Sequence, residues 1–270
     1  MIGTKFKGRL GNQLFQIVFH QYLKTNNPDK TLFISNPHHS YLAKYFEFDE
    51  DINWKLTTLS YRIYSYFIKL LYKFKEHYIE NNHVPNKVDV IDNTIYKGFF
   101  QTDWYFKNIV GSFKLTLKKS VQDKFNLQFG QSFDTNKTIV VHIRRTDYLY
   151  YGKRDISLPL EYFQRRIDEL GDIENYLVYF VSDEMDSVRS FFKQKKNYIF
   201  SSNDEITDFQ IIKNADIAII SNSSFAWWAA YLSEKQNVVY APKNWLGFRI
   251  GKEHPKRIMT EKFIWCEVLS

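Results

Sequence analysis

The stretch KTIVVHIRRTDY, residues 137–148, sets the pattern for the second half of this chain. Its β-branched run predicts a buried strand over TIVVHI. Helix and strand patterns alternate after it: helix 159–170, strand 176–182, helix 184–195, strand 197–200, a helix around 208–213, strand 216–220, a helix from 225 and strand 237–241. This alternation predicts a parallel sheet with helices on both faces, whose ligands bind at the carboxyl ends of the strands.

Charged residues follow the first of these strands. His142 lies within it, and Arg144, Arg145 and Asp147 come at its carboxyl end. Arginine presents a planar fork of donors that binds phosphate oxygens in pairs, and charge-assisted hydrogen bonds of this kind contribute about 1.5–3 kcal/mol each. The cluster therefore predicts an anion site. The alternative is a structural Arg–Asp pair that ends the strand.

A second polar cluster, SNSSFAWWAAYL at 221–232, follows the apolar strand 217–220. Ser and Asn before a helix are typical N-cap residues, and a helix start offers amide donors and a positive dipole end, where phosphate binds readily. Capping alone would need only one such residue, so the cluster predicts a second anion contact. We expect Trp227 and Trp228 to lie in the core; contact with a sugar is the alternative.

The N-terminus carries a third segment of interest. A strand over 2–6, a glycine turn KGRLGN, a helix over Gln13–Lys24 and a strand over 30–35 predict one βαβ unit. The turn lacks the Gly-Lys-Ser/Thr ending of a nucleotide P-loop and the GxGxxG spacing. Its glycines still allow close backbone approach, so Arg9, Asn12 and the backbone amides could contact a diphosphate across an interdomain cleft.

Residues 61–80, YRIYSYFIKLLYKFKEHYIE, carry aromatic and aliphatic side chains at helical spacing. They are Tyr64, Phe67, Ile68, Leu71, Phe74 and Tyr78. We expect this stripe to face the core. The basic residues among them also fit the alternative of a peripheral helix on an anionic membrane surface.

Composition excludes several classes of protein. The apolar content of 44% supports a folded core, and Lys plus Arg exceed Asp plus Glu by 37 to 30, a net charge of +7. No nucleic-acid-binding module accompanies this charge. The single cysteine, Cys266, precludes an intrachain disulfide and favours a reducing compartment. Without a signal-peptide pattern or an 18-residue apolar run, we expect a cytoplasmic protein, with peripheral contact at the inner face of the membrane as an addition.

Metal-ligand spacing is weak throughout. Asp49-Glu50-Asp51 formally matches Asp-x-Asp, but it follows YFEF rather than a strand end, so we interpret it as a solvated loop or a helix start. No other carboxylate–histidine cluster has ligand spacing. We expect no metal and no cofactor, with arginines and helix amides stabilising a leaving diphosphate instead.

Together, GRLGNQLFQ, VHIRRTDY and SNSSFAWWAAYL resemble the three motifs of the α-1,2-fucosyltransferases of glycosyltransferase family 11, in the same order. YKGFFQTDWYF and FVSDE resemble further family segments, and more distant similarity extends to α-1,6- and protein O-fucosyltransferases. The resemblance implies an α/β fold of the GT-B type, two Rossmann-like domains facing across a cleft. Residues 1–130 would form the acceptor-side domain and residues 131–270 the GDP-fucose-binding domain, with a C-terminal tail that can cross back.

The resemblance also implies the reaction: transfer of L-fucose from GDP-β-L-fucose to the 2-hydroxyl of a terminal galactose, in an oligosaccharide or glycolipid-linked glycan, with inversion and without a metal. Arg144 would contact the β-phosphate and Arg145 would support that charge. The remaining donor-binding residues, by motif position, would be Gly8, Gly11, Asn12, His142, Asp208, Ser223, Ser224 and Phe225.

The general base and the linkage are less constrained by these motifs. Asp147 is our preferred base, although its neighbouring arginines lower its basicity; the alternatives are Asp103, Asp155 and Glu184. Gly8-Arg9 replaces a frequent Gly-Gly, and Thr146 replaces a frequent Gly, both towards the core-fucosylating relatives. An α-1,6 or protein O-linkage is thus one alternative function, and a non-catalytic glycan-binding protein is another.

Overall fold

The computed structural model describes residues 1–268 and divides into two compact units. One comprises residues 1–119 with 255–258, and the other comprises residues 120–254 with the segment from Met259 onward. The domain boundary expected after residue 130 stays a prediction; the chain is helical there, through α6 (Lys119–Phe125), the π-helix η2 (Asn126–Gly130) and α7 (Gln131–Thr135).

The first unit is built on a four-stranded parallel sheet in the order β2-β1-β5-β4. Its strands are β1 (Ile2–Thr4), β2 (Leu32–Ile34), β4 (Lys75–Tyr78) and β5 (Thr94–Lys97). The helix α1 (Leu10–Asn26) connects β1 to its neighbour β2, so the predicted βαβ unit is confirmed.

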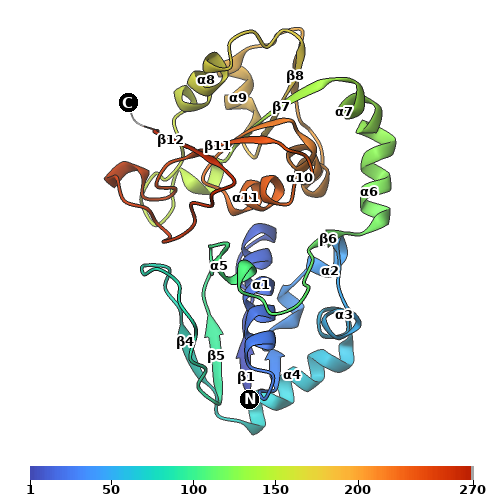
Figure 1. Ribbon diagram of the computed structural model, residues 1–270, viewed down its shortest axis with the longest axis vertical. Helices are drawn as coiled ribbons and strands as arrows, with labels where there is room; N and C mark the ends of the chain where they lie inside the picture. The colour runs from blue at the N-terminus through green and yellow to red at the C-terminus, as the bar shows by residue number, and fades with distance from the viewer. Residues whose placement is uncertain (269–270) are drawn as a thin grey trace. The chain divides into compact units, whose positions relative to one another are not determined.

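Shorter elements complete the first unit (Figure 1). They are η1 (Pro37–His39), α2 (Leu42–Tyr45), α3 (Glu50–Thr57), α4 (Leu59–Leu71), α5 (Trp104–Lys107) and the antiparallel pair β3 (Phe46–Glu47) and β6 (Thr116–Leu117).

The helix predicted over 61–80 is only partly correct. It ends at Leu71, and residues 75–78 form β4, which pairs with β5. A sheet edge offers backbone partners that a local helical pattern does not reveal, so tertiary pairing overrides the periodicity. The predicted core-facing stripe is also wrong in large part, because Phe67, Leu71 and Tyr78 are exposed.

The second unit is built on a six-stranded parallel sheet in the order β12-β11-β10-β7-β8-β9. The strands are β7 (Lys137–Ile143), β8 (Tyr176–Ser182), β9 (Tyr198–Phe200), β10 (Ile217–Ile220), β11 (Val238–Pro242) and β12 (Ile264–Cys266). Five of these six strands match the predicted ones. The parallel sheet expected from the alternating pattern is confirmed.

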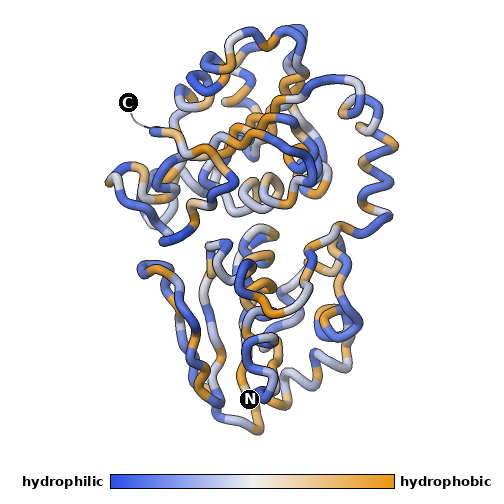
Figure 2. The backbone as a smooth tube through the Cα atoms, in the orientation of Figure 1, coloured by the Kyte–Doolittle hydropathy of each residue, from blue (hydrophilic) through white to orange (hydrophobic). Residues whose placement is uncertain are grey.

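Helices cover both faces of this sheet (Figure 1). They are α8 (Leu160–Glu169), α9 (Met185–Phe192), α10 (Glu205–Asn214) and α11 (Ser224–Tyr231), with the 3₁₀ turns η3 (Thr146–Tyr148) and η4 (Phe248–Ile250) in loops. The central strands β7, β8 and β10 are strongly apolar, as the orange segments of Figure 2 show, because most of their residues are buried.

Alternation along β7 assigns its residues to two faces. Ile139, Val141 and Ile143 belong to the core formed with α8 and α9. Successive side chains of a strand point to opposite faces, so His142 points to the other face, where it lies against Phe225 of α11. Trp227 and Trp228 of α11 are fully buried, which confirms the prediction that they are core residues.

Candidate functional site

The carboxyl ends of the parallel strands in the second unit bring the predicted polar residues to one edge. β7 ends before Arg144, its neighbour β10 ends before Ser221, and its other neighbour β8 ends before Asp183. Because all three strands run in the same direction, the loops that follow them meet at this edge.

His142 links the first two of these loops. Its ring Nδ1 lies 2.9 Å from the Ser221 Oγ, and its carbonyl accepts a 3.0 Å hydrogen bond from the Ser221 amide. Burial and the positive charge of Arg144 lower the pKa of His142 to about 3. The ring is therefore neutral at pH 7, and it contributes shape and a hydrogen bond rather than charge.

Carboxylates hold both arginines. Arg144 forms ion pairs with Asp147, at 2.5 Å, and with Asp183, at 3.0 Å. Arg145 pairs through Nε with Glu184, at 2.5 Å, while its backbone amide donates to Asp183. The arginine side chains are mostly buried, so these pairs fix the direction of each guanidinium group.

Asp183 was not among the predicted site residues. It contacts Arg144, the Arg145 backbone and the Thr146 hydroxyl, so it connects three consecutive residues of the loop after β7. Its position directly after β8 is the signal that could have identified it, since the same reasoning located Arg144 after β7.

Asp147 remains half-exposed although it pairs with Arg144; 51% of its side chain is accessible. Tyr148, next to it in η3, donates its hydroxyl to the Asn222 carbonyl at 3.2 Å, and burial raises the pKa of this tyrosine. Asn222 in turn donates to the Ile156 carbonyl at 2.8 Å. These bonds connect the loop after β7 to the start of α11.

The start of α11 has the N-cap geometry that the sequence predicts. Ser223 is the N-cap, and its carbonyl accepts a 2.9 Å hydrogen bond from the Trp227 amide. Ser221, Asn222 and Ser223 are buried. Within residues 1–268 the Ser223 side chain makes no capping hydrogen bond, so the first amides of α11 are not satisfied by it.

Asp208 lies in the first turn of α10 and is the most perturbed carboxylate of this unit. Its Oδ1 accepts a 2.5 Å hydrogen bond from the Ser201 hydroxyl, which follows β9. Burial raises its pKa to about 6. α10 packs on α11 through Phe209 and Phe225, whose ring centroids are 5.4 Å apart.

The predicted residues Gly8, Gly11 and Asn12 lie in the first unit, at the carboxyl end of β1. Gly8 has a φ of 82°, a conformation that suits glycine, and a side chain built there would meet Asn12. Gly11 is buried in the first turn of α1. Asn12 accepts a 2.9 Å hydrogen bond from Gln101.

Two buried glutamines of the same motif were not among the predicted functional residues. Gln13 donates to the carbonyls of Gly8 and His39, at 3.1 and 2.9 Å. Gln16 accepts from the Lys7 amide and donates to the Gly98 carbonyl, at 3.0 and 2.9 Å. Part of the motif GRLGNQLFQ therefore serves to hold three loops of the first unit together.

Asp49 is the N-cap of α3, and its side chain accepts from the Ile52 amide. This confirms the interpretation of Asp49-Glu50-Asp51 as a helix start. Asp51 pairs with Lys24 and Lys55, each at 2.8 Å. Nowhere in residues 1–268 do three His, Cys, Asp or Glu side chains converge in a way that could hold a metal ion.

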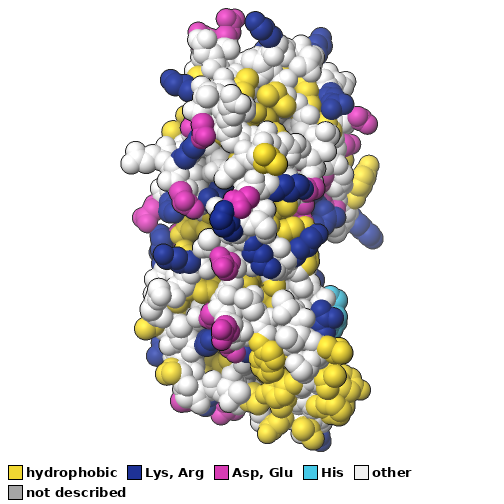
Figure 3. All heavy atoms as spheres, turned by 90° about the vertical axis from the view of Figure 1, so that its right-hand side faces the viewer, with side chains coloured by type: hydrophobic (Ala, Val, Ile, Leu, Met, Phe, Trp, Pro, Cys, Tyr) yellow, Lys and Arg dark blue, Asp and Glu magenta, His cyan; other side chains and the backbone are white. Residues whose placement is uncertain are grey.

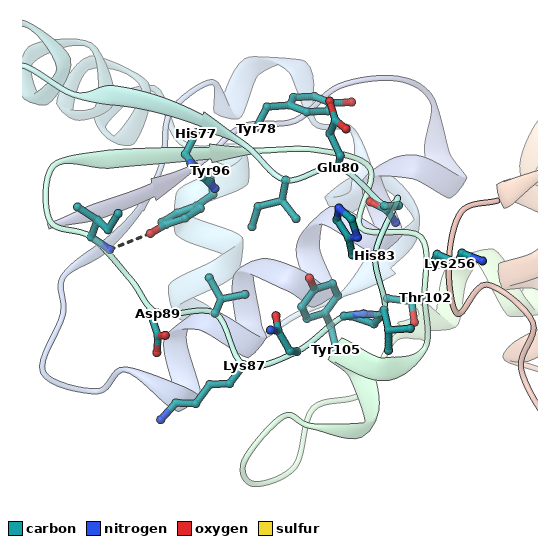
Figure 4. A pocket seen from close by; sticks show the side chains of 17 residues that line it. His77, Tyr78, Glu80, His83, Lys87, Asp89, Tyr96, Thr102, Tyr105 and Lys256 are labelled. Carbon is teal, nitrogen blue, oxygen red and sulfur yellow. Dashed lines mark hydrogen bonds between the residues drawn. The ribbon is translucent and has the colours of Figure 1, made fainter. Parts of the chain in front are cut away.

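A cavity of about 540 Å³ lies in the first unit, beyond the carboxyl ends of β4 and β5 (Figure 4). Its wall combines rings with polar groups and includes His77, Tyr78, His83, Thr102, Tyr105 and Lys256. Such a mixture of aromatic faces and hydrogen-bonding groups suits a polar ring compound such as a sugar.

The family profile described as glycosyl transferase family 11 matches residues 1–259 of this chain. An alpha-1,2-colitosyltransferase of Escherichia coli is 31% identical over 170 residues, which cover 55% of this chain and 54% of that protein. The O-antigen biosynthesis glycosyltransferase WbnK of Escherichia coli is 29% identical over 117 residues, 40% of this chain and 39% of WbnK.

A galactoside 2-alpha-L-fucosyltransferase of Caenorhabditis elegans is 28% identical over 159 residues, 53% of this chain and 43% of that enzyme. The chain thus spans about half the length of these relatives, or less.

Two groups of solved structures share the fold. The α-1,6-fucosyltransferase NodZ from Bradyrhizobium, crystallised with GDP, superposes with a TM-score of 0.52 at 13% identity, over 86% of this chain and 92% of NodZ. POFUT1 in complex with GDP superposes with a TM-score of 0.51 at 13% identity, over 89% of this chain and 97% of that structure. The fold is therefore of the GT-B type, built from α/β units with parallel sheets.

Proposed function

Because this chain belongs to glycosyl transferase family 11, we propose that it transfers L-fucose from GDP-β-L-fucose to the 2-hydroxyl of a terminal galactose in a glycan. The anomeric centre inverts, and no metal takes part. The observation that carries the proposal is the pair Arg144 and Arg145, held by carboxylates at the carboxyl edge of the six-stranded sheet.

Arg144 is proposed to bind the β-phosphate as GDP departs. Negative charge develops on the diphosphate in the transition state, and donors that are already oriented stabilise it without reorganising. The pairs that Arg144 makes with Asp147 and Asp183 supply this orientation. Arg145, oriented by Glu184, adds a second positive charge beside the same loop.

The rest of the nucleotide is proposed to bind along the edge formed by α10 and α11. The amides and hydroxyls of Ser223 and Ser224 face phosphate oxygens at the start of α11, where the helix dipole also favours an anion. His142 and Asp208 hold the guanine or the ribose, and Phe225 supports the His142 ring. Gly8, Gly11 and Asn12 are proposed to bind the donor on the basis of the motif GRLGNQLFQ alone.

Asp147 is proposed as the general base that removes the proton from the acceptor hydroxyl. Its half-exposed side chain can be reached by a substrate, whereas the burial of Asp208 directs that carboxylate towards binding. Asp103, Asp155 and Glu184 are the alternative bases. All three are ion-paired, with Lys107, Arg249 and Arg145 respectively.

The acceptor glycan is proposed to bind in the cavity of the first unit (Figure 4). The exposed ring of His83 offers a face on which a pyranose can stack, while Lys256 offers a donor for its hydroxyls. A galactose-terminated oligosaccharide fits the size and polarity of this cavity.

A second candidate donor is a colitosyl nucleotide. The relative described as an alpha-1,2-colitosyltransferase aligns over a larger share of this chain than the two other relatives. Colitose lacks one hydroxyl of fucose, and a site built to hydrogen-bond that hydroxyl rejects the sugar without it by a large factor. Donor preference therefore distinguishes the two candidates.

The test is a screen of GDP-fucose and GDP-colitose against galactose-terminated oligosaccharides, with and without chelator. We expect GDP release with GDP-fucose, unaffected by chelator, and a product whose NMR spectrum contains the α-1,2 linkage. A different linkage would reassign the acceptor chemistry. Tight glycan binding without GDP release from any donor would favour a non-catalytic glycan-binding protein.

A further inference from the structure

The helix α4 (Leu59–Leu71) faces the protein with a narrow side that combines polar and apolar residues, and Ile68 on this side packs with Phe33 and Ile95. Tyr61, Ser65 and Ile68 are its buried residues. The Tyr61 hydroxyl accepts from the Ile34 amide at 2.8 Å, and the Ser65 hydroxyl donates to the Ile34 carbonyl at 2.9 Å. Ile34 belongs to β2, an edge strand, so α4 satisfies backbone groups that would otherwise lack a strand partner.

The opposite side of α4 is apolar and exposed. Leu59, Ile63, Tyr66 and Leu70 follow one another at spacings of four, three and four residues, so they form a single stripe along the helix. Their exposed fractions are 69%, 49%, 58% and 63%. Phe67, Leu71 and Tyr72 extend the apolar surface beside the stripe. We call these seven residues the α4 patch.

The α4 patch covers one end of the first unit in space-filling view, where yellow side chains gather at the lower right of Figure 3. A typical amphipathic helix buries its apolar side. A contiguous exposed patch of large apolar side chains usually marks a surface that contacts a partner or a membrane. The exposed apolar side of α4 is therefore the feature that requires an explanation.

The charged residues of α4 and of the turn that follows it are all basic. Residues 59–75 contain Arg62, Lys69, Lys73 and Lys75 and no acidic residue. Arg62 and Lys69 follow each other at a spacing of seven residues, so they lie along one flank of the stripe. Burial and the charge of Lys5, which itself pairs with Glu76 at 3.1 Å, lower the pKa of Lys69.

We propose that the α4 patch inserts into the interface of an anionic lipid bilayer, with Arg62 and Lys69 at the level of the headgroups. A helix that lies in the interface carries Trp, Tyr, Phe or Leu on its inserted side and Lys or Arg beside them. The absence of acidic residues in 59–75 fits an anionic surface. Two copies of the same cationic patch would instead repel each other. No helix within residues 1–268 is long and apolar enough to cross a bilayer.

The experiment is flotation of the protein with vesicles of phosphatidylcholine, alone or mixed with phosphatidylglycerol. We expect binding to the mixed vesicles that weakens as salt increases. Ile63→Glu and Leu70→Glu should each reduce vesicle affinity at least about tenfold, because each removes an inserted side chain and adds repulsion. Arg62→Gln combined with Lys69→Gln should reduce it about 25-fold, because each cation contributes about fivefold.

Leu127→Glu is the matched control. Leu127 lies in the second unit and is 91% exposed, so it undergoes the same chemical change outside the α4 patch. This variant should bind mixed vesicles as the unmodified protein does. Ile63→Ser and Leu70→Ser keep the test valid if a glutamate prevents folding, and circular dichroism verifies that each variant is folded.

Three results would overturn the proposal. The first is flotation with mixed vesicles that the α4 variants leave unchanged, and the second is no flotation at all. The third is a dimer in light scattering that Leu70→Glu dissociates, without vesicle binding, which would assign the α4 patch to a second copy of the chain. Because neither readout uses a sugar nucleotide, the outcome is independent of the proposed transferase activity.

Discussion

The loops after β1 and β7 each follow the carboxyl end of an interior strand of a parallel sheet, but they use their polar groups differently. Around the loop after β1, Gln13 and Gln16 form neutral hydrogen bonds to backbone atoms. In the loop after β7, Arg144 and Arg145 form ion pairs. Neutral bonds fix a backbone, whereas fixed charges can stabilise a charge that develops in a reaction. The comparison indicates that the loop after β1 is a scaffolding loop, which holds the backbone in place. The loop after β7 carries charges that can take part in a reaction.

The two units also share a feature, a buried histidine beside a hydroxyl. The Nδ1 of His20 lies 2.8 Å from the Thr4 Oγ1 at the end of β1, and that of His142 lies 2.9 Å from the Ser221 Oγ. Burial, with the charges of Lys55 and Lys24, lowers the pKa of His20 to about 3, as burial and Arg144 do for His142. Both rings are neutral at pH 7.

The largest expected effect belongs to Arg144→Ala. It removes the charge proposed to face the leaving diphosphate. Arginines that stabilise negative charge on phosphate groups in a transition state accelerate the reaction by about 10³-fold or more. Measured turnover with GDP-fucose should fall by about that factor. Arg189→Ala removes an exposed arginine from the same unit and should retain activity. Near-normal turnover of Arg144→Ala would exclude the leaving-group role.

Asp147→Asn should have the next largest effect, a fall in kcat of about 10²-fold, because a positioned base contributes at least this much. The acid limb of the pH profile of kcat/KM should disappear with it. Asp186→Asn, on the exposed side of α9, is the control. If the pH profile keeps its shape and only KM rises, Asp147 orients Arg144 and is not the base.

The two buried histidines predict an acid-sensitive stability. Their pKa values are depressed in the folded state, so their contribution to stability is complete above about pH 6.5 and is lost as the pH falls towards about 3. At about pH 4.5 each should cost on the order of 1–3 kcal/mol of unfolding free energy.

Thermal unfolding of His20→Gln and His142→Gln between neutral and acidic pH tests this expectation. Each variant should lose less stability on acidification than the unmodified protein, whereas His254→Gln, at an exposed position, should not differ from it. Parallel pH curves for all four proteins would assign acid sensitivity to other groups.

The smallest effect concerns the scaffolding loop. Gly8→Ala places a side chain at a φ of 82° and should reduce the unfolding free energy by about 1–2 kcal/mol. Gly130→Ala is the matched control, because Gly130 has a helical φ of −50° and alanine there should be neutral or stabilising. Equal midpoints in denaturant for the two variants would contradict a backbone requirement at Gly8.

The regular alternation in the second unit made its fold predictable from sequence. A strand that is buried on both faces, such as β7, requires apolar residues along most of its length. Its continuous apolar run is therefore visible in the sequence. The residues at the strand ends follow directly, which is how Arg144 and Ser223 were identified. The strand β12 was not predicted, because no α-helix lies between β11 and β12, so the alternation of helix and strand stops before it.

The first unit was less predictable for a physical reason. β4 is exposed along its length, so it lacks the burial pattern that marks a strand, and its residues continue the helical periodicity of α4. The glutamines Gln13 and Gln16 form bonds to loops up to 82 residues away, which local patterns do not encode. Asp183 was missed because its partners come from another strand end.

The sequence by itself determined the parallel sheets, the motifs and the set of charged residues, since these depend on local periodicity and on residue chemistry. Only the tertiary structure decided which carboxylate pairs with which arginine, that both buried histidines are neutral, and that one apolar side of α4 remains exposed. Those properties depend on burial and on neighbours distant in the chain, and a side chain acquires both only when the elements pack.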